Sequence, residues 1–338
     1  ILPDFVIGRS EQVMDKPRKD KIAQFCQVPT DHIISAPDVS SIYDIPDMFE
    51  KQEFAKKVLK SFGLRAKKND LVAWHRFVKA RSNGHSEVRI GVIGKYFSTG
   101  NFTLSDAYIS VLESIKHAGA AVGVMPKIEW LNAEEYEKDP KKLKELDNLN
   151  AVIIPGGFGS RGIEGKIAAI NYVRKHKIPY LGLCYGMQCA VIEFARNELG
   201  WKTANTTEIN PKSSHPVIDL MAGQGDNVKG KKYGGTLRLG SYCCKLSPDT
   251  SSRQAYGEAE ISERHRHRYE FNSAYRSELE KAGLVIAGTS PDDRLVEIVE
   301  VKDHPFFVGV QFHPEFQSRP LSPHPLFVGL LNAAKQRK

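Results

Sequence analysis

Cys184 lies where an apolar run, Ile178 to Leu183, meets a run with helical periodicity, Met187 to Asn197. A glycine stands two residues before it and another two residues after it, at Gly182 and Gly186. Such glycines allow a turn too tight for a Cβ atom, so the sulfur should project from a strand end toward a helix N-terminus, which favours a thiolate. This is the nucleophile-elbow pattern with a thiol in place of a hydroxyl, and it predicts cysteine-dependent acyl transfer. A buried, inert cysteine at a strand end is the alternative that the motif alone leaves open.

A histidine and a carboxylate near the end of the chain could assist this thiol. The run Val308-Gly-Val-Gln-Phe-His313-Pro-Glu315 is typical of a β-strand. A spacing of two residues puts His313 and Glu315 on the same side of an extended chain. The imidazole could then act as a base for the thiol while the carboxylate orients it. An ordinary strand end with a solvated acid would have the same sequence.

A glycine-rich loop follows the apolar run Ala151 to Ile154, with the sequence Pro155-Gly-Gly157-Phe-Gly-Ser-Arg-Gly162. A loop of this kind can present backbone N–H groups to an oxyanion. Taken alone, it is equally typical of a turn with no chemical role. The three segments together, in the order oxyanion loop, nucleophile and His/Glu pair, favour the catalytic interpretation.

These segments resemble the class I glutamine amidotransferase domain of the CTP synthase family. The run Glu263-Arg-His-Arg-His-Arg268-Tyr-Glu-Phe-Asn272 makes the resemblance specific, and it extends over nearly the whole chain. It implies that Cys184 attacks the side-chain amide of glutamine and that the backbone N–H groups of Gly157 and Tyr185 hold the oxyanion. His313 would protonate the departing nitrogen, and Glu315 would fix the histidine tautomer.

The same resemblance assigns Gln188, Glu208 and Arg268 to glutamine binding. Tyr185 departs from the leucine that the family usually has beside the nucleophile. A pair of histidines in the arginine-histidine run, His265 and His267, could suggest a metal site, but alternating arginines repel a cation. No metal site is expected.

The first part of the chain is too short to bury a core of its own. Residues 1–51 resemble the C-terminal end of the ligase domain of CTP synthases. The resemblance implies that Lys21 faces a pyrimidine nucleotide and that Pro37, Asp38 and Val39 line the base of ATP. The sequence alone favours a different interpretation of Lys21, as an exposed helix lysine. A basic segment with helical periodicity follows, so we predict an interdomain linker over residues 52–86 and an amidotransferase domain over 87–338.

Strand-like and helix-like runs alternate from Val88 onward. The expected strands are 89–93, 121–125, 151–154 and 179–183, and the expected helices are 106–118, 164–176 and 187–199. This alternation predicts an α/β fold with a mostly parallel sheet covered by helices and a site at the carboxyl ends of the strands. A partial second α/β domain is expected at the N-terminus.

The composition agrees with a soluble globular protein of 338 residues with 41% hydrophobic residues. No apolar run approaches the length of a membrane span, and the first residues do not resemble a signal peptide. Five cysteines without zinc-type spacing indicate a reducing, cytoplasmic location. The sequence shows no recognisable nucleic-acid module, so phosphate-bearing nucleotides are a sufficient explanation of the net charge of +8, and a solvated basic surface is the alternative. The missing initiator methionine predicts that the chain is a fragment.

In the CTP synthase family, the ammonia passes to a ligase domain that aminates UTP to CTP with ATP and Mg²⁺, and GTP is an activator. The present chain contains no phosphate-binding loop of the pattern G-x-x-x-x-G-K-[ST], so no cofactor is expected in it. A homo-oligomer, a tetramer, is expected for the full-length protein. Two alternatives stay open: a stand-alone cysteine hydrolase of the same fold, and a non-catalytic assembly or regulatory protein.

Overall fold

A computed structural model of the chain describes residues 2–68, 70–82, 86–95, 98–99, 102–103, 108–221 and 237–337. The chain divides into two compact units, Ile1–Lys79 and Ala80–Lys338. This division is a property of how closely the residues pack. The functional boundaries expected at residues 51 and 86 stay predictions.

The first unit is built on a pair of parallel strands, β1 (Val6–Ser10) and β2 (Ile33–Pro37). Its helices are α1 (Lys16–Cys26), α2 (Ile45–Glu50), α3 (Phe54–Ser61) and α4 (Val72–Ser82), with short 3₁₀ turns at Thr30–His32 and Ile42–Asp44. The segment expected as a linker thus contains two helices. In α4, Trp74 and Phe77 lie 6.1 and 5.0 Å from the ring of Tyr43, measured between ring centroids. These aromatic contacts attach α4 to the rest of the first unit.

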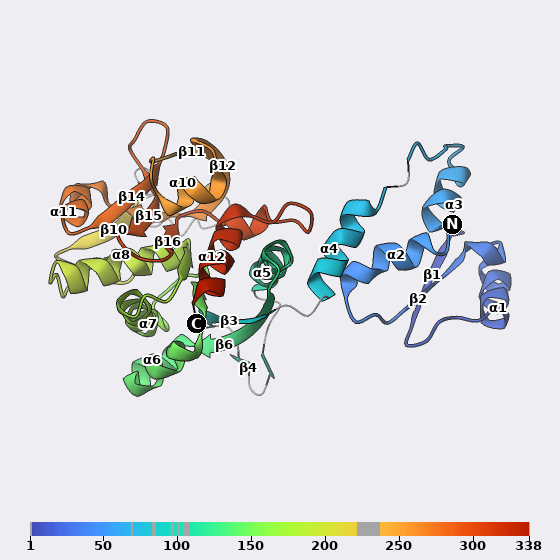
Figure 1. The fold of residues 1–338 in the computed structure, drawn as a ribbon, viewed down its shortest axis with the longest axis horizontal. Helices are drawn as coiled ribbons and strands as arrows, with labels where there is room; N and C mark the ends of the chain where they lie inside the picture. The colour runs from blue at the N-terminus through green and yellow to red at the C-terminus, as the bar shows by residue number, and fades with distance from the viewer. Residues whose placement is uncertain are drawn as a thin grey trace. The chain divides into compact units, whose positions relative to one another are not determined.

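The second unit contains a mixed sheet of nine strands within the described residues, in the order β12-β11-β14-β15-β16-β8-β7-β3-β6 (Figure 1). The strands β16, β8, β7, β3 and β6 run parallel to one another, whereas the pairings from β12 to β16 are antiparallel. The bounds are β3 (Glu87–Gly94), β6 (Met125–Asn132), β7 (Ala151–Ile154), β8 (Tyr180–Leu183), β11 (Arg238–Leu246), β12 (Glu260–His267), β14 (Leu284–Thr289), β15 (Val296–Val301) and β16 (Phe307–Val310).

Two smaller sheets accompany it. One has the order β13-β10-β9 and the other pairs β4 with β5. Their bounds are β4 (Ser98–Thr99), β5 (Phe102–Thr103), β9 (Asn205–Thr206), β10 (Pro216–Leu220) and β13 (Tyr269–Phe271).

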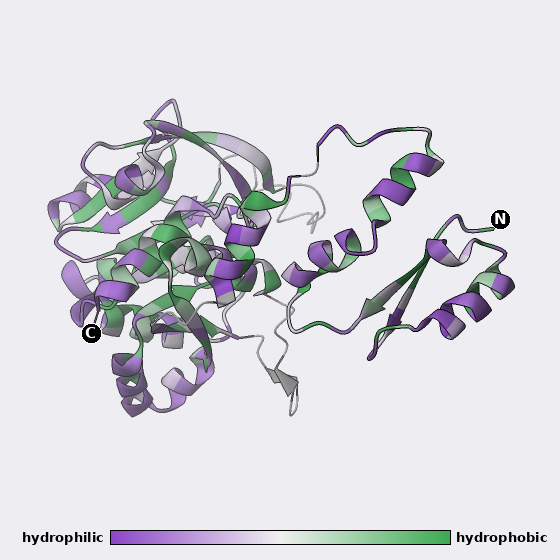
Figure 2. Cartoon of the chain, turned by 45° about the vertical axis from the view of Figure 1, so that its right-hand side comes forward, coloured by the Kyte–Doolittle hydropathy of each residue, from purple (hydrophilic) through white to green (hydrophobic). Residues whose placement is uncertain are grey.

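Helices cover both faces of the large sheet and enclose two cores. One core receives Val152 and Ile154 of β7 together with α6, α7 and α8, and the other receives Ala151 and Ile153 together with α5 and α12. The alternation follows from the period of two along a strand. Figure 2 shows hydrophobic strands, in green, inside the second unit. The helices are α5 (Ile109–Val122), α6 (Ala133–Lys138), α7 (Ile163–Lys175), α8 (Tyr185–Glu198), α10 (Ser251–Tyr256), α11 (Arg276–Lys281) and α12 (Pro325–Gln336), with 3₁₀ segments at Pro140–Asn148, Ser273–Tyr275 and Pro314–Phe316.

The expected α/β class is confirmed, and most expected elements lie within a few residues of the observed ones. One expected strand, 121–125, is wrong. The helix α5 continues through Ala120 and Ala121 to Val122, and it ends at Gly123, which adopts φ 70°. Alanine favours helix and a glycine with positive φ terminates one, so the following strand, β6, begins only at Met125. Of the helix expected at 106–118, Asp106 and Ala107 lie outside the described residues.

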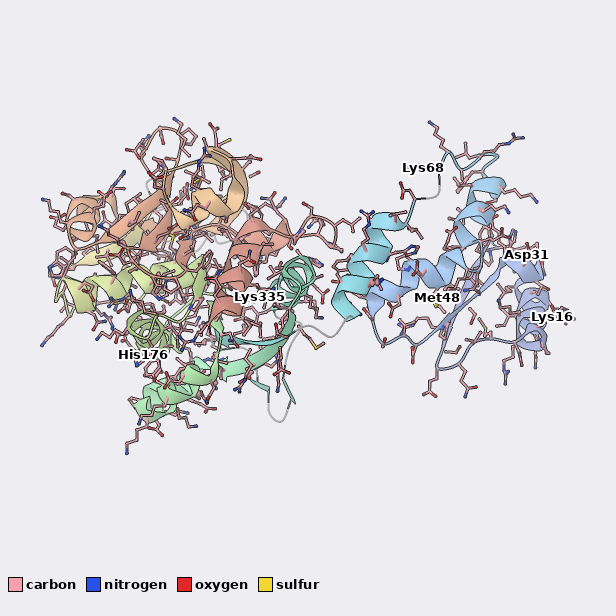
Figure 3. The ribbon with its side chains drawn as sticks, in the orientation of Figure 1. Lys16, Asp31, Met48, Lys68, His176 and Lys335 are labelled. Atoms are coloured by element: carbon pink, nitrogen blue, oxygen red, sulfur yellow. The ribbon has the colours of Figure 1, made fainter. Side chains whose placement is uncertain are left out.

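The charged side chains lie mainly at the surface, as Figure 3 shows for Lys16 and Lys335, both of which are exposed. Among the helices that the structure describes, none has the length and the apolar character required to span a membrane.

Candidate active site

The turn at Cys184 has the geometry that its flanking glycines predict. Cys184 follows β8 directly and is the N-cap of α8, with φ 50° and ψ −97°. A Cβ on Gly186 would lie 2.2 Å from the carbonyl oxygen of Ile154, and one on Gly182 would lie 2.8 Å from the carbonyl carbon of Gly186. No side chain fits at either glycine, and the strained cysteine backbone is held by a 2.6 Å hydrogen bond from its N–H to the carbonyl of Val310. The sulfur is therefore fixed at the start of a 14-residue helix.

His313 and Glu315 form a pair, although not on a strand as expected. The strand β16 ends at Val310, and Pro314–Phe316 form a 3₁₀ turn with His313 as its N-cap. Proline has no N–H to continue a strand ladder and suits the first position of a helical turn, which explains why Glu315 lies in a 3₁₀ turn and not on a strand. The turn brings His313 Nδ1 to 2.7 Å from Glu315 Oε1. The ring also stacks on Phe316, with 5.3 Å between centroids.

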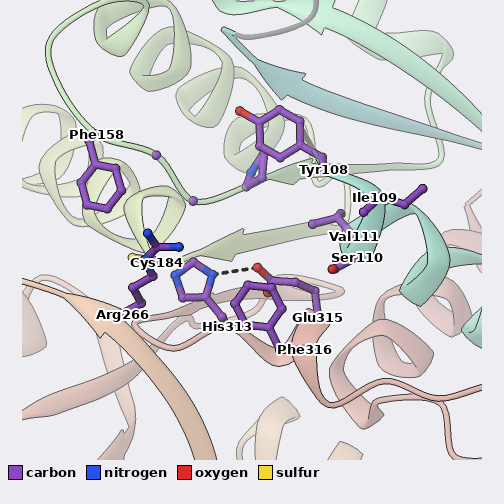
Figure 4. Close-up of a pocket in the computed structure, with 13 residues that line it drawn as sticks. Tyr108, Ile109, Ser110, Val111, Phe158, Cys184, Arg266, His313, Glu315 and Phe316 are labelled. Carbon is purple, nitrogen blue, oxygen red and sulfur yellow. Dashed lines mark hydrogen bonds and ion pairs between the residues drawn. The ribbon is translucent and has the colours of Figure 1, made fainter. Parts of the chain in front are cut away.

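His313 lies between Cys184 and Glu315 (Figure 4). Burial by itself lowers the pKa of His313, but the neighbouring Cys184 sulfur and the Glu315 carboxylate outweigh it and raise the pKa to about 10. The imidazole is hydrogen-bonded to both partners. An imidazolium beside a thiolate is the protonation state that nucleophilic attack by sulfur requires.

Cys184, His313 and Glu315 open onto one cavity of about 260 Å³. Its other lining residues are Tyr108, Ile109, Ser110, Val111, Pro155, Gly156, Gly157, Phe158, Arg266 and Phe316. A Cβ on Gly156 would meet His313 Cε1 at 2.7 Å, so the loop and the histidine are in close contact. The oxyanion loop, the nucleophile and the base predicted from three distant segments thus meet at the carboxyl ends of β7, β8 and β16.

The oxyanion loop is held by side chains from three other segments. Gly159 N–H donates to Glu208 Oε1 at 2.9 Å, and the hydroxyl of Tyr185 donates to Gly159 O at 2.7 Å. Lys95 Nζ donates to the carbonyl oxygen of Phe158. Tyr185 is the first residue of α8, where backbone N–H groups have no partner within the helix. This N–H and that of Gly157 are the oxyanion donors expected from the sequence, and both belong to segments beside Cys184.

Gln311 is a contact of the nucleophile that the sequence analysis missed. Its side chain is fully buried, and Nε2 lies 3.7 Å from Cys184 Sγ as a hydrogen-bond donor. Its Oε1 accepts from Gln188 Nε2 at 3.2 Å, and the same Gln188 nitrogen donates to the carbonyl of Tyr269 at 2.8 Å. Gln311 stands two residues before His313 in the sequence, but no spacing rule identifies the partner of a buried amide that directly follows a strand.

The residues expected to bind glutamine differ in whether they line the cavity. Gly157 lines the cavity, whereas Tyr185, Gln188, Glu208 and Arg268 are not among its lining residues. Gln188 and Arg268 are 3% and 6% exposed, and Glu208 is half-buried against the oxyanion loop. Arg266 lines the cavity instead, and the sequence analysis did not select it. The glutamine-binding roles stay predictions.

The buried pair His265 and His267 lies with Glu297 in a cluster whose ligand atoms are within 4.8 Å of one another. The alternating arginines Arg264 and Arg266 lie on the exposed face of β12, so they do not act on this cluster in the way that the sequence analysis expected. That no metal binds here stays a prediction. Arg238 supplies the positive charge, with Nη1 at 2.6 Å from Glu297 Oε1. Burial, followed by Arg238, lowers the pKa values of His265 and His267 to about 2 and 3. The two neutral rings hydrogen-bond each other at 3.0 Å. Arg238 neutralises the carboxylate of Glu297, and the histidines supply a hydrogen bond to each other.

The residues expected to contact nucleotides lie in the first unit. Pro37 and Val39 line a cavity of about 520 Å³, together with Val13, Lys19, Ser35, Asp44, Asp47, Met48, Lys51 and Gln52. Asp38 is exposed and forms an ion pair with Arg9 at 3.5 Å. Lys21 is exposed on α1 and does not line that cavity. The nucleotide-binding roles of all four residues stay predictions.

Comparison with protein families agrees with this geometry. The family described as glutamine amidotransferase class-I matches residues 103–333, which is most of the chain. The chain therefore belongs to the class I glutamine amidotransferase family. A second family, described as CTP synthase N-terminus, matches residues 1–64.

Curated relatives narrow the assignment to the CTP synthases. The chain is 50% identical to the CTP synthase of Carboxydothermus hydrogenoformans over 99% of its own length, and 50% identical to that of Fibrobacter succinogenes over 100%. It spans 61% and 59% of the lengths of these relatives. Among solved structures, the glutaminase domain of Trypanosoma brucei CTPS with bound acivicin is 37% identical, with a TM-score of 0.68, and the match covers 74% of this chain and 95% of that one. These matches confirm the resemblance inferred from the sequence motifs.

Proposed function

We propose that the second unit hydrolyses glutamine and supplies the ammonia for CTP formation in the full-length protein. The observation that carries this proposal is the convergence of Cys184, His313, Glu315 and Gly157 on one cavity. A buried thiol with a raised-pKa histidine, a carboxylate and a glycine loop is the set of groups that cleavage of an unactivated amide needs.

Each step uses a group in this cavity. The Cys184 thiolate attacks the amide carbon, a C–S bond forms, and the carbonyl oxygen becomes an oxyanion at the N–H groups of Gly157 and Tyr185. His313 gives its proton to the amide nitrogen, the C–N bond breaks and ammonia leaves. Water then gives a proton to His313 and attacks the thioester, the C–S bond breaks, and glutamate is released with the Cys184 thiolate and the protonated His313 restored. Glu315 holds the imidazole in orientation throughout.

For the full-length protein, we infer that the ammonia is used in the ATP- and Mg²⁺-dependent amination of UTP, with GTP as activator and a tetramer as the assembly. The similarity of residues 1–64 to the CTP synthase N-terminus supports this inference. The first-unit cavity that contains Pro37 and Val39 is the corresponding candidate for nucleotide contact. ATP-dependent CTP formation by the full-length protein, measured with glutamine and with ammonia as nitrogen donors, tests it.

A glutamine-derived diazoketone is expected to label Cys184 once and to stop glutaminase activity. Cys189 provides the internal comparison, because burial raises the pKa of its thiol to about 12 and leaves it protonated at neutral pH. Peptide mass spectrometry locates the adduct. An adduct on Cys189 or Cys244, or full activity after stoichiometric labelling, contradicts the proposed nucleophile. A chain without glutaminase activity would favour the assembly or regulatory alternative.

Arg268→Ala is expected to raise KM for glutamine by roughly 10- to 150-fold if Arg268 binds the α-carboxylate, since a hydrogen bond to a charged group contributes about 1.5–3 kcal/mol. In the full-length protein, ammonia-dependent CTP formation should survive, because ammonia bypasses the glutamine pocket. Arg268 is buried, so the variant could also act through the fold. Parallel loss of both activities would show that structural role and would remove Arg268 from the binding site.

A further inference from the structure

The side chain of Lys166, in α7, is completely buried beside the oxyanion loop. Its Nζ has no hydrogen-bond partner among the described residues. The ammonium lies 5.0 Å from the centroid of the Tyr185 ring, and it would be 3.8 Å from a Cβ built on Gly157. The cation is thus located between an aromatic face and the backbone of the predicted oxyanion donor.

A lysine in such a place destabilises the fold. Burying an ammonium without a hydrogen-bond acceptor is unfavourable, and a cation–π contact returns only part of the lost hydration. The pKa of Lys166 is accordingly lowered to about 8, mainly by burial; Cys189 opposes this shift and Lys95 adds to it. Groups whose pKa values are displaced in this way, close to a reactive cavity, are candidates for a functional role.

We propose that Lys166 is a positioning residue of the glutaminase site, where its ammonium, seated on the Tyr185 ring beneath Gly157, favours the negative charge that develops on the oxyanion. The inference rests on the proposed function of the cavity. Lys166 does not line that cavity, so it acts through the Gly157 backbone and through the field of its charge. Within the described residues, the charged or titratable groups around it are Lys95, Cys189 and Tyr185, with Glu208 on the far side of the loop at Gly159.

Tyr185 connects this cation to the loop. The Lys166 ammonium lies over the ring of Tyr185, and the Tyr185 hydroxyl donates to Gly159 O at 2.7 Å. One side chain, directly after the nucleophile, therefore contacts both the cation and the loop.

Lys166→Met tests the proposal because methionine retains most of the volume and removes the charge. We expect kcat of the glutaminase to fall about 10-fold, less than the ~10²-fold or more that follows loss of a direct oxyanion donor, with KM changed by less than about twofold. We also expect a higher melting temperature. The matched control is Lys175→Met, which replaces an exposed lysine in the same helix and should leave kcat, KM and the melting temperature unchanged.

The pH dependence gives two further measurements. In the wild type, kcat should decline as the pH rises through about 8 and Lys166 loses its proton, and this decline should be absent in Lys166→Met. The folded-state pKa lies below the unfolded value, so the unfolded chain binds the additional proton between pH 8 and about 10. The loss of stability caused by the buried Lys166 ammonium is therefore complete below pH 8 and becomes smaller as the pH rises above 8. The difference in melting temperature between variant and wild type should shrink from pH 7 to pH 9.5.

Tyr185→Phe separates the two contacts of the tyrosine. It keeps the ring beneath the ammonium, so the decline near pH 8 should persist, although loss of the bond to Gly159 lowers the rate. A wild-type rate and pH profile in Lys166→Met would overturn the inference, and so would a fall in both kcat and melting temperature, which would indicate a structural role. If the wild type itself hydrolyses no glutamine, the proposed function fails and this inference fails with it.

Discussion

Cys184→Ala is expected to reduce glutamine hydrolysis by at least about 10⁴-fold, the scale of loss that follows removal of a catalytic nucleophile. The sulfur is the atom that forms the thioester, so the Cys184→Ala variant can still bind glutamine but cannot form the covalent intermediate. Initial rates of ammonia or glutamate release measure the effect. The variant should fold normally, because alanine fits the positive φ of 50° no worse than cysteine and the hydrogen bond to Val310 comes from the backbone.

Cys189→Ala is the matched control for this variant. Cys189 lies about one helical turn further along α8, and its side chain is fully buried in the core. We expect a modest loss of stability from the small cavity and a rate within about twofold of the wild type. Measurable hydrolysis at near wild-type rate in Cys184→Ala, or an equal loss in both variants, would exclude Cys184 as the nucleophile.

The reactive part of the site could be predicted because its signals are local. Gly182 and Gly186 flank Cys184 at a spacing that is visible in the sequence, and Gly182 is required by the close approach of the Gly186 backbone within the turn. Gly186 is required by a more distant neighbour, the carbonyl oxygen of Ile154 in β7. His313 and Glu315 are two residues apart, and their contact at 2.7 Å needs only a short turn. The strand expected at these residues was wrong, because Pro314–Phe316 form a 3₁₀ turn, but the pairing was unaffected because both geometries bring the two side chains together.

The supporting residues could not be predicted because their partners are distant in sequence. Gln311 reaches Cys184 across the parallel pairing of β16 with β8, and Lys166 reaches Gly157 and Tyr185 through the packing of α7 on α8. A pattern with a period of two or 3.6 residues indicates which face is buried, not which side chain is opposite. The same reason explains why the sequence analysis did not select Arg266 as a residue of the cavity. It also explains why the ion pair of Glu297 with Arg238, which is distant in sequence, was not expected.

His313→Ala is expected to reduce kcat/KM by about 10²- to 10⁴-fold, the range for loss of a general acid–base. Glu315→Gln should have a smaller effect, about 10-fold, because the amide oxygen can still accept from Nδ1 while the negative charge is lost. Both side chains are largely buried, so the melting temperature of each variant must be recorded with its rate.

The pH profile of Glu315→Gln distinguishes an electrostatic role of the carboxylate from a structural one. The Glu315 carboxylate is one of the two neighbours that raise the pKa of His313 to about 10 in the wild type. Without its charge the imidazolium is less favoured, so the pKa of His313 falls. The protonated acid that serves the leaving nitrogen is then lost at a lower pH, and the alkaline decline of kcat should move downward. A reduced rate with an unmoved alkaline decline would show that Glu315 only holds the turn, and near wild-type rates in both variants would mean that another group transfers the proton.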